Sequence, residues 1–135
     1  MTMLVFPACA QNLFHRAENR VQVALVKVDR SADYTEVHLQ AQAALKGVCW
    51  NLTGEDSPYL LAEGRRHYLL KGDNITACPK RRAYANKEIM VLRFQPLSPE
   101  VRTFSLVEGR GGEKQMTDPA STKGIFWNFL NVKLG

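Results

Sequence analysis

The sequence has few of the residues that mark catalytic and metal-binding proteins. Among 135 residues there are three cysteines and three histidines, and no cysteine lies in a Cys-x-x-Cys pair or near a histidine at zinc-ligand spacing. The histidines, His15, His38 and His67, lack the short spacings that build a metal-binding face. Neither a Gly-x-Ser-x-Gly turn nor a glycine-rich phosphate loop occurs. We therefore predict no catalytic residue, no metal site and no cofactor, with an enzyme site assembled from residues distant in the sequence as the alternative.

The chain also lacks a long hydrophobic run. The longest apolar stretch, Met3–Ala10, is interrupted by Pro7 and is far shorter than the roughly 20 residues that a membrane-spanning helix needs. Residues 8–10 (Ala-Cys-Ala) fit the small-x-small rule for cleavage of an export signal, but no basic region precedes them. We assign residues 1–19 to an N-terminal arm or to the remnant of an export signal. A periplasmic or secreted location is favoured over a cytoplasmic one.

The cysteines also bear on the cellular location of the protein. If Cys9 belongs to a signal, Cys49 and Cys78 remain as an even pair, as expected of one disulfide in an oxidising compartment. The alternative is a pair of buried free thiols in a cytoplasmic core.

The residues that are abundant indicate a globular β protein. Hydrophobic residues make up 45% and charged residues 23% of the chain, which is ordinary globular usage, and the length is that of one domain. Thr35 to Gln42 alternate strictly between apolar and polar, which predicts a strand with one buried face. Similar patterns and turn signals predict strands over residues 21–28, 35–42, 48–52, 59–61, 67–70, 88–94, 103–107 and 125–134.

The segments between these strands indicate turns and loops. Gly64 suits a tight hairpin turn, and residues 71–74 suit another. Residues 11–20 show no clean period and predict a helical turn or an irregular lead-in, whereas the glycine- and proline-rich residues 108–124 predict a long mobile loop. Glu63 and Glu108 each precede a glycine, so turn-forming roles are available to both carboxylates. We predict an all-β, mainly antiparallel domain over residues 20–135, a sandwich with a small β-barrel as the alternative.

Three motifs carry a resemblance to a known group of domains. Leu92–Leu97 ends in Phe-x-Pro-Leu, Phe104–Gly109 forms a Phe-x-x-x-Glu-Gly corner, and Trp127–Leu134 makes a closing strand. Together they resemble immunoglobulin-like β-sandwich domains of uncharacterised exported bacterial proteins. The resemblance covers most of residues 20–134 and implies an immunoglobulin-like sandwich in an exported bacterial protein. It implies no particular ligand.

Positive charge is concentrated in one segment. The whole chain has a net charge of +5, whereas residues 65–87 hold seven basic residues and one acid, a net charge of +6. Tyrosines are interleaved with them, as in grooves that follow phosphates and stack bases. The alternative is a solvated surface. The predicted contacts to an anion or a nucleic acid are Arg65, Arg66, Tyr68, Lys80, Arg81, Arg82 and Tyr84.

These observations favour two functions. The first is a non-enzymatic binding or accessory module, exported, that recognises a protein or glycan partner through a sheet face or a loop end. The second is a nucleic-acid-binding β domain that uses residues 65–87. The strand edges of such a fold also permit a homodimer, with Phe126–Phe129 as a contact surface or, alternatively, as part of the core.

Overall fold

The computed structural model describes residues 9–18, 21–121 and 126–135. Its elements in chain order are β1 (Cys9–Arg16), β2 (Val23–Arg30), β3 (Thr35–Ala41), β4 (Leu45–Val48), β5 (Tyr59–Ala62), β6 (Arg65–Asp73), β7 (Arg82–Tyr84), β8 (Ile89–Phe94), β9 (Thr103–Val107), the helix α1 (Gly109–Thr117), the 3-10 turn η1 (Pro119–Ser121) and β10 (Phe129–Lys133).

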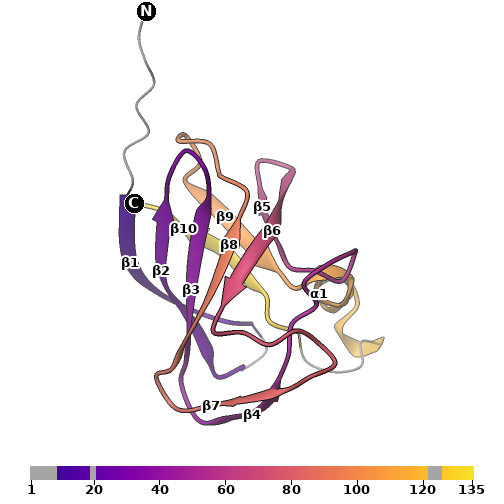
Figure 1. Cartoon of the computed structure of the whole chain (residues 1–135). Coiled ribbons are helices and arrows are strands. Elements are labelled where there is room, and N and C mark those ends of the chain that lie inside the picture. Colours follow the sequence, from indigo (N-terminus) through magenta and orange to yellow (C-terminus); the bar gives the residue numbers. More distant parts are fainter. Residues whose placement is uncertain (1–8, 19–20, 122–125) are drawn as a thin grey trace, which may run out of the picture.

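Most of the strands form one curled antiparallel sheet, shown in Figure 1. Its strand order is β1-β2-β3-β8-β6-β5-β9-β10, and β4 and β7 form a separate two-stranded sheet. The two edges of the large sheet meet: the backbone N–H of Glu18 donates to the carbonyl of Asn128 at 2.9 Å, and that of Gly135 to the Oε1 of Gln11 at 3.1 Å. The predicted all-β, mainly antiparallel class, a sandwich or small barrel, is confirmed.

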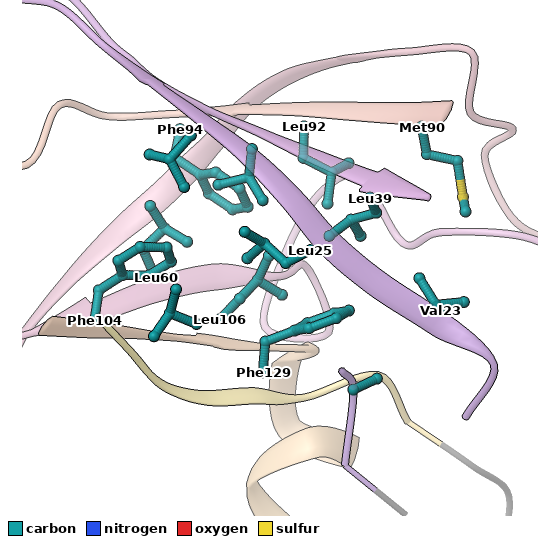
Figure 2. Close-up of a cluster of buried hydrophobic side chains, with 14 of the residues drawn as sticks. Val23, Leu25, Leu39, Leu60, Met90, Leu92, Phe94, Phe104, Leu106 and Phe129 are labelled. Atoms are coloured by element: carbon teal, nitrogen blue, oxygen red, sulfur yellow. The ribbon is translucent and has the colours of Figure 1, made fainter. Parts of the chain in front are cut away.

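The core lies inside this curled sheet because side chains alternate between the two faces of each strand. In β3, Val37, Leu39 and Ala41 are buried, while the residues between them are half-buried. Leu39 pairs with Met90 on β8, so the apolar faces of neighbouring strands are in register. Figure 2 shows side chains from several strands meeting there, among them Val23, Leu25, Leu39, Leu60, Met90, Leu92, Phe94, Phe104, Leu106 and Phe129.

The first strand differs from the sequence prediction. Residues 11–20 were expected to form a helical turn or an irregular lead-in, but Cys9–Arg16 is a strand paired with β2. Its register shifts between Asn12 and His15, a bulge that interrupts the pairing period along the strand. The folded domain therefore includes residues that were assigned to the arm. The remainder of the export-signal hypothesis, residues 1–8, lies outside the described residues.

The glycine-rich segment after β9 also differs, because it contains helix α1 instead of a continuous loop. Its glycines serve close packing: a Cβ at Gly111 would overlap the ring of Phe126, and one at Gly112 would overlap the side chain of Asn128. The side chain of Gln115 fixes the helix by exchanging two hydrogen bonds with the backbone of Phe126, at 2.9 and 3.0 Å. Tertiary contacts thus outweigh the poor helix propensity of glycine.

The β5–β6 hairpin follows the predicted pattern, with a correction at its far end. Glu63 and Gly64 have φ angles of 50° and 76°, as a two-residue turn between right-twisted strands requires. Residues 71–74, expected to form a turn, instead continue β6 as far as Asp73. The strand includes Gly72, over which Ile75 packs closely. A Cβ at residue 72 would overlap the side chain of Ile75.

Candidate functional site

A pocket of about 670 Å³ lies between the small β4–β7 sheet and the segment that leads into β10. We call it the Glu108 pocket. It is lined by Val21, Gln22, Ala44, Leu45, Lys46, Gly47, Val48, Cys49, Asn51, Cys78, Arg81, Glu108, Phe126 and Trp127. Its volume falls in the range of small-molecule sites, and its lining combines aromatic, amide and charged side chains.

One wall of the pocket is held by a covalent and hydrogen-bonded clamp. Cys49 and Cys78 form a disulfide. Next to it, the backbone N–H of Trp50 donates to Thr76 and the N–H of Cys78 donates to Trp50, each at 2.9 Å. Beyond the clamp, Nη1 of Arg81 donates to the carbonyl of Gly47 at 3.0 Å. These contacts fix the wall although the β4–β7 sheet has only two short strands.

The part of the pocket around Glu108 is organised by the buried side chain of Asn128. Its Oδ1 accepts from the backbone N–H of Glu108 at 3.1 Å, and its Nδ2 donates to the carbonyl of Gly112 at 3.0 Å. Asn128 is 1% exposed, so both bonds are shielded from water. The backbone N–H of Trp127 donates to the carboxyl group of Glu108. The ends of β9 and β10 and the first turn of α1 are thereby tied together around Glu108.

Burial gives Glu108 an unusual acidity. It raises the pKa of the carboxyl group from 4.5 to about 8, and the hydrogen bond from Trp127 lowers it only in part. The protonated form of the carboxyl group therefore predominates at neutral pH. A neutral carboxyl group can donate one hydrogen bond and accept others, which makes Glu108 a versatile contact for a polar ligand.

The aromatic part of the pocket is rigid. Trp127 packs edge-on against Trp50, with ring centroids 5.2 Å apart and an interplanar angle of 83°. Trp50 is 1% exposed, as expected for a core anchor, and its indole N–H has no acceptor within the described ranges. Because Trp50 is packed in the core, its edge contact holds the ring of Trp127 in the lining that also contains Glu108.

Comparison of this chain with protein-family models, with curated proteins and with solved structures found no match. The resemblance to immunoglobulin-like domains of exported bacterial proteins therefore stays a prediction. Within residues 9–18, 21–121 and 126–135, no helix is long and apolar enough to cross a membrane. The same ranges hold no cluster of His, Cys, Asp or Glu side chains arranged for a metal ion.

The predicted basic surface is divided between two places. Arg65, Arg66 and Tyr68 lie at the β5–β6 turn, whereas Lys80 and Arg81 precede β7 at the opposite end of the molecule in Figure 1. The five residues do not form one groove.

Several of the predicted contacts are also engaged within the fold. Arg66 forms an ion pair with Glu113 at 3.0 Å, and Arg82 is paired with Glu88. Tyr84 is 2% exposed and its hydroxyl donates to the carbonyl of Asn74 at 2.7 Å, so its ring offers no face for a base. From the predicted set, the structure brings Arg81, Cys49 and Cys78 to the Glu108 pocket.

Glu108 and Trp127 were not among the site residues predicted from the sequence. A signal for Glu108 exists in the alternation of β9, because Phe104 and Leu106 face inward and Glu108 continues the same face. A carboxyl group that follows two core positions at a spacing of two is placed to point inward. The following glycine directed the interpretation toward a turn instead. Trp127 has no comparable signal, since its position depends on contact with Trp50.

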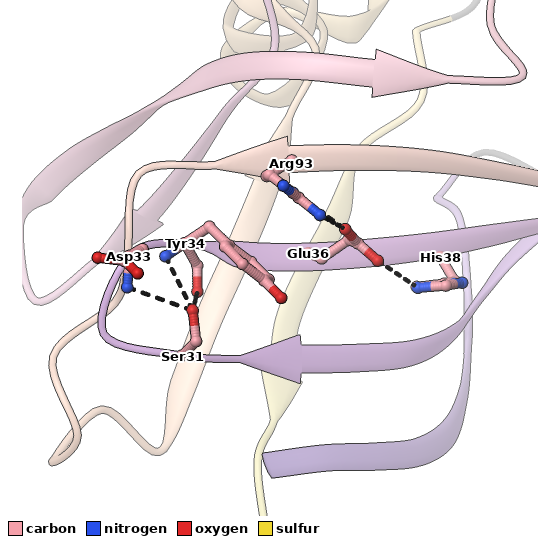
Figure 3. A network of polar contacts seen from close by, with 6 residues as sticks. All are labelled: Ser31, Asp33, Tyr34, Glu36, His38 and Arg93. Atoms are coloured by element: carbon pink, nitrogen blue, oxygen red, sulfur yellow. Dashed lines mark hydrogen bonds and ion pairs between the residues drawn. The ribbon is translucent and has the colours of Figure 1, made fainter. Parts of the chain in front are cut away.

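A second polar cluster lies on the outer face of the sheet and is satisfied internally (Figure 3). Arg93 on β8 donates from Nε and Nη2 to the Oε2 of Glu36 on β3, at 3.0 and 2.7 Å. Its guanidinium also lies 4.0 Å from the ring centroid of Tyr34. Nε2 of His38 lies 3.0 Å from the Oε1 of Glu36. Because these side chains satisfy one another, the cluster supports the pairing of β3 with β8.

Proposed function

We propose that this chain is a non-enzymatic binding module that recognises a glycan in the Glu108 pocket. The observation that carries the proposal is the fixed ring of Trp127 beside the polar groups of Glu108, Asn51 and Gln22 in one cavity. Sugar rings present C–H groups that pack on aromatic rings and hydroxyl groups that need paired donors and acceptors. A rigid aromatic ring next to amide and carboxyl groups meets both needs.

The composition of the pocket argues against catalysis as its main role. Glu108 is the one carboxyl group among the residues that line it, and Ser, Thr and His are absent from that lining. Hydrolysis of a glycosidic bond requires two carboxyl groups on opposite sides of the bond. A single protonated acid can bind a sugar hydroxyl but supplies no partner base for such a reaction.

The disulfide supports a setting outside the cytoplasm. A bond between Cys49 and Cys78 persists where the surroundings are oxidising, as in the periplasm or outside the cell. Glycans of cell envelopes and matrices are accessible in the same compartments. The proposal therefore includes export from the cytoplasm and a bacterial source as well as the glycan partner.

The test is binding of soluble oligosaccharides to the purified protein, measured by isothermal titration calorimetry and by chemical-shift changes at the indole N–H of Trp127. We expect saturable binding, lost in Trp127→Ala and weakened about tenfold in Asn51→Ala and Gln22→Ala, which alter exposed side chains and spare the fold. Tyr68→Ala is the matched control, because Tyr68 is an exposed aromatic residue outside the pocket. The proposal is contradicted if Tyr68→Ala loses binding while the variants of the pocket residues retain it.

Nucleic-acid binding has less support than the glycan proposal. It requires several free cations and stacking rings along one path, whereas Tyr84 is buried and Arg66 and Arg82 are ion-paired. Fluorescence anisotropy with labelled single-stranded and duplex oligonucleotides tests it. Tight binding that falls steeply with salt and in Arg81→Ala would make nucleic acid the preferred partner.

The structure also bears on the proposed homodimer. Strand addition needs a free sheet edge, but β1 and β10 lie against one another through the contacts of Glu18 and Gly135. Phe129 is fully buried and Phe126 contacts α1, so residues 126–129 serve the interior and the pocket. A dimer stays a prediction, which sedimentation at several protein concentrations tests directly.

A further inference from the structure

We propose that the Glu108 pocket takes a saccharide that carries a carboxylate, held by Lys46 and Arg81 and by a hydrogen bond from Glu108. This inference rests on the proposed glycan-binding function and names the chemical class of its ligand. Three features of the pocket support it: the two cations in its lining, the guanidinium donors of Arg81 that are not used by the bond to Gly47, and the protonated Glu108 in the same lining.

The two cations lie in the same lining and are exposed. Elsewhere in the described residues, exposed arginines are often neutralised: Arg110 forms ion pairs with Glu55 and Asp56, and Arg66 with Glu113. No ion pair to Lys46 or Arg81 occurs in the described part of the chain. The pocket therefore presents two positive charges without an anion of the protein beside them.

Arg81 is also oriented for a ligand. One nitrogen of its guanidinium donates to the carbonyl of Gly47, which fixes the side chain along the pocket wall. A guanidinium has five N–H donors in a planar fork that matches the two oxygens of a carboxylate. The donors left over after the bond to Gly47 can bind such a group while the first bond holds the plane in place.

Glu108 admits an anion because it is neutral at physiological pH. Burial raises the pKa of its carboxyl group to about 8, so it presents an O–H donor where an ionised carboxylate would repel the ligand. The charged groups in the pocket lining are Lys46 and Arg81, and the cystine does not titrate. On the adjoining α1, Arg110 and Glu113 are held in ion pairs with Asp56 and Arg66, and both lie outside the lining.

The first experiment compares paired probes by isothermal titration calorimetry at pH 6.5 and low salt. Trisaccharides of galacturonate, glucuronate and mannuronate are each measured beside their methyl esters, which remove the charge and keep the ring. We expect the acids to bind about tenfold more tightly than the esters, since a charge-assisted pair replaces a neutral contact. Lys46→Gln combined with Arg81→Gln abolishes that preference. The control, Arg65→Gln combined with Lys71→Gln, removes the same charge from exposed positions outside the pocket and retains it.

The second experiment uses pH to test the role of Glu108. Affinity for the acid probes falls in the wild type between pH 7 and 9, because Glu108 ionises and repels the ligand. Glu108→Gln stays neutral and keeps its affinity across this range, while the esters show no pH dependence with either protein.

The outcomes separate the two proposals. If the esters bind as tightly as the acids, the carboxylate inference is overturned and the glycan-binding function stands. If neither series binds and neutral oligosaccharides also fail, the glycan-binding function itself is overturned. If the affinity of the wild type for the acid probes is constant from pH 7 to 9, Glu108 does not contact the carboxylate of the ligand.

Discussion

The backbone N–H of Trp127 donates a hydrogen bond to the carboxyl group of Glu108 and so joins the end of β9 to the segment that leads into β10. This contact favours the charged form of the acid, but burial of Glu108 disfavours that form more strongly and raises the pKa of the carboxyl group to about 8. The burial that makes Glu108 a candidate ligand contact therefore also affects the stability of the fold.

Stability should depend on pH through Glu108. The pKa of its carboxyl group is about 8 in the folded chain and 4.5 ordinarily, so folding favours the protonated form. The stabilisation is fully present below about pH 4.5 and is lost as the pH rises toward 8. At about 1.4 kcal/mol per pKa unit, the free energy of unfolding falls by at most about 5 kcal/mol over this pH range. We expect Glu108→Gln to raise the free energy of unfolding at pH 8.5 and to change it little at pH 4.

Urea unfolding at the two pH values measures this effect. Glu63→Gln, at an exposed position in the hairpin turn, is the control and should leave stability nearly unchanged at both. A variant Glu108→Gln that is less stable than the wild type at pH 8.5 contradicts the prediction.

Removing the disulfide should destabilise the fold and open the pocket. Cys49 and Cys78 are 29 residues apart, and closing a loop of this length in the unfolded chain corresponds to about 3–4 kcal/mol. We expect Cys49→Ala combined with Cys78→Ala to lose about that much unfolding free energy. Oligosaccharide affinity should fall as well, because the wall that bears Arg81 is no longer clamped. Reduced wild-type protein should match the variant, and equal stability of reduced and oxidised protein would be evidence against this account.

The glycines of α1 should resist replacement although they lie in a helix. Alanine favours a helix over glycine by about 1 kcal/mol, so propensity alone predicts that Gly112→Ala stabilises the protein. The added Cβ would overlap the buried Oδ1 of Asn128, and overpacking of this kind costs about 1–3 kcal/mol. We expect a net loss of stability, measured by thermal unfolding. Lys114→Ala, at an exposed position of the same helix, should be close to neutral.

The ion pair of Arg93 and Glu36 on the outer face of the sheet should stabilise the fold only above acidic pH. Burial raises the pKa of Glu36, but hydrogen bonds from Arg93 and His38 outweigh it and leave the pKa below 4.5. The stabilisation is therefore present above the ordinary pKa and lost as the pH falls through the lowered one. We expect Arg93→Met to lower the melting temperature at pH 7 and to have almost no effect at pH 2.5. An equal loss at both pH values would assign the effect to packing on Tyr34.

The fold class could be predicted from local patterns because the faces of a strand are encoded in its own residues. The alternation from Thr35 to Gln42 and the apolar run at residues 88–94 identified β3 and β8, and Gly64 identified the hairpin turn. Two errors have the same origin. The bulge in β1 disturbs its period, and the glycines of α1 indicate flexibility locally although they serve close packing.

The sequence alone determined that this chain forms a β domain with an alternating strand at residues 35–42 and a hairpin turn at Gly64. Only the tertiary structure decided which residues share a pocket, because Cys49, Arg81, Glu108 and Trp127 come from four separate parts of the chain. It also decided the state of Glu108, since burial depends on what packs over a residue and not on its neighbours in sequence. Charge counted along residues 65–87 predicted one basic surface, whereas the fold places the β5–β6 turn and the start of β7 at opposite ends of the molecule and so divides that charge.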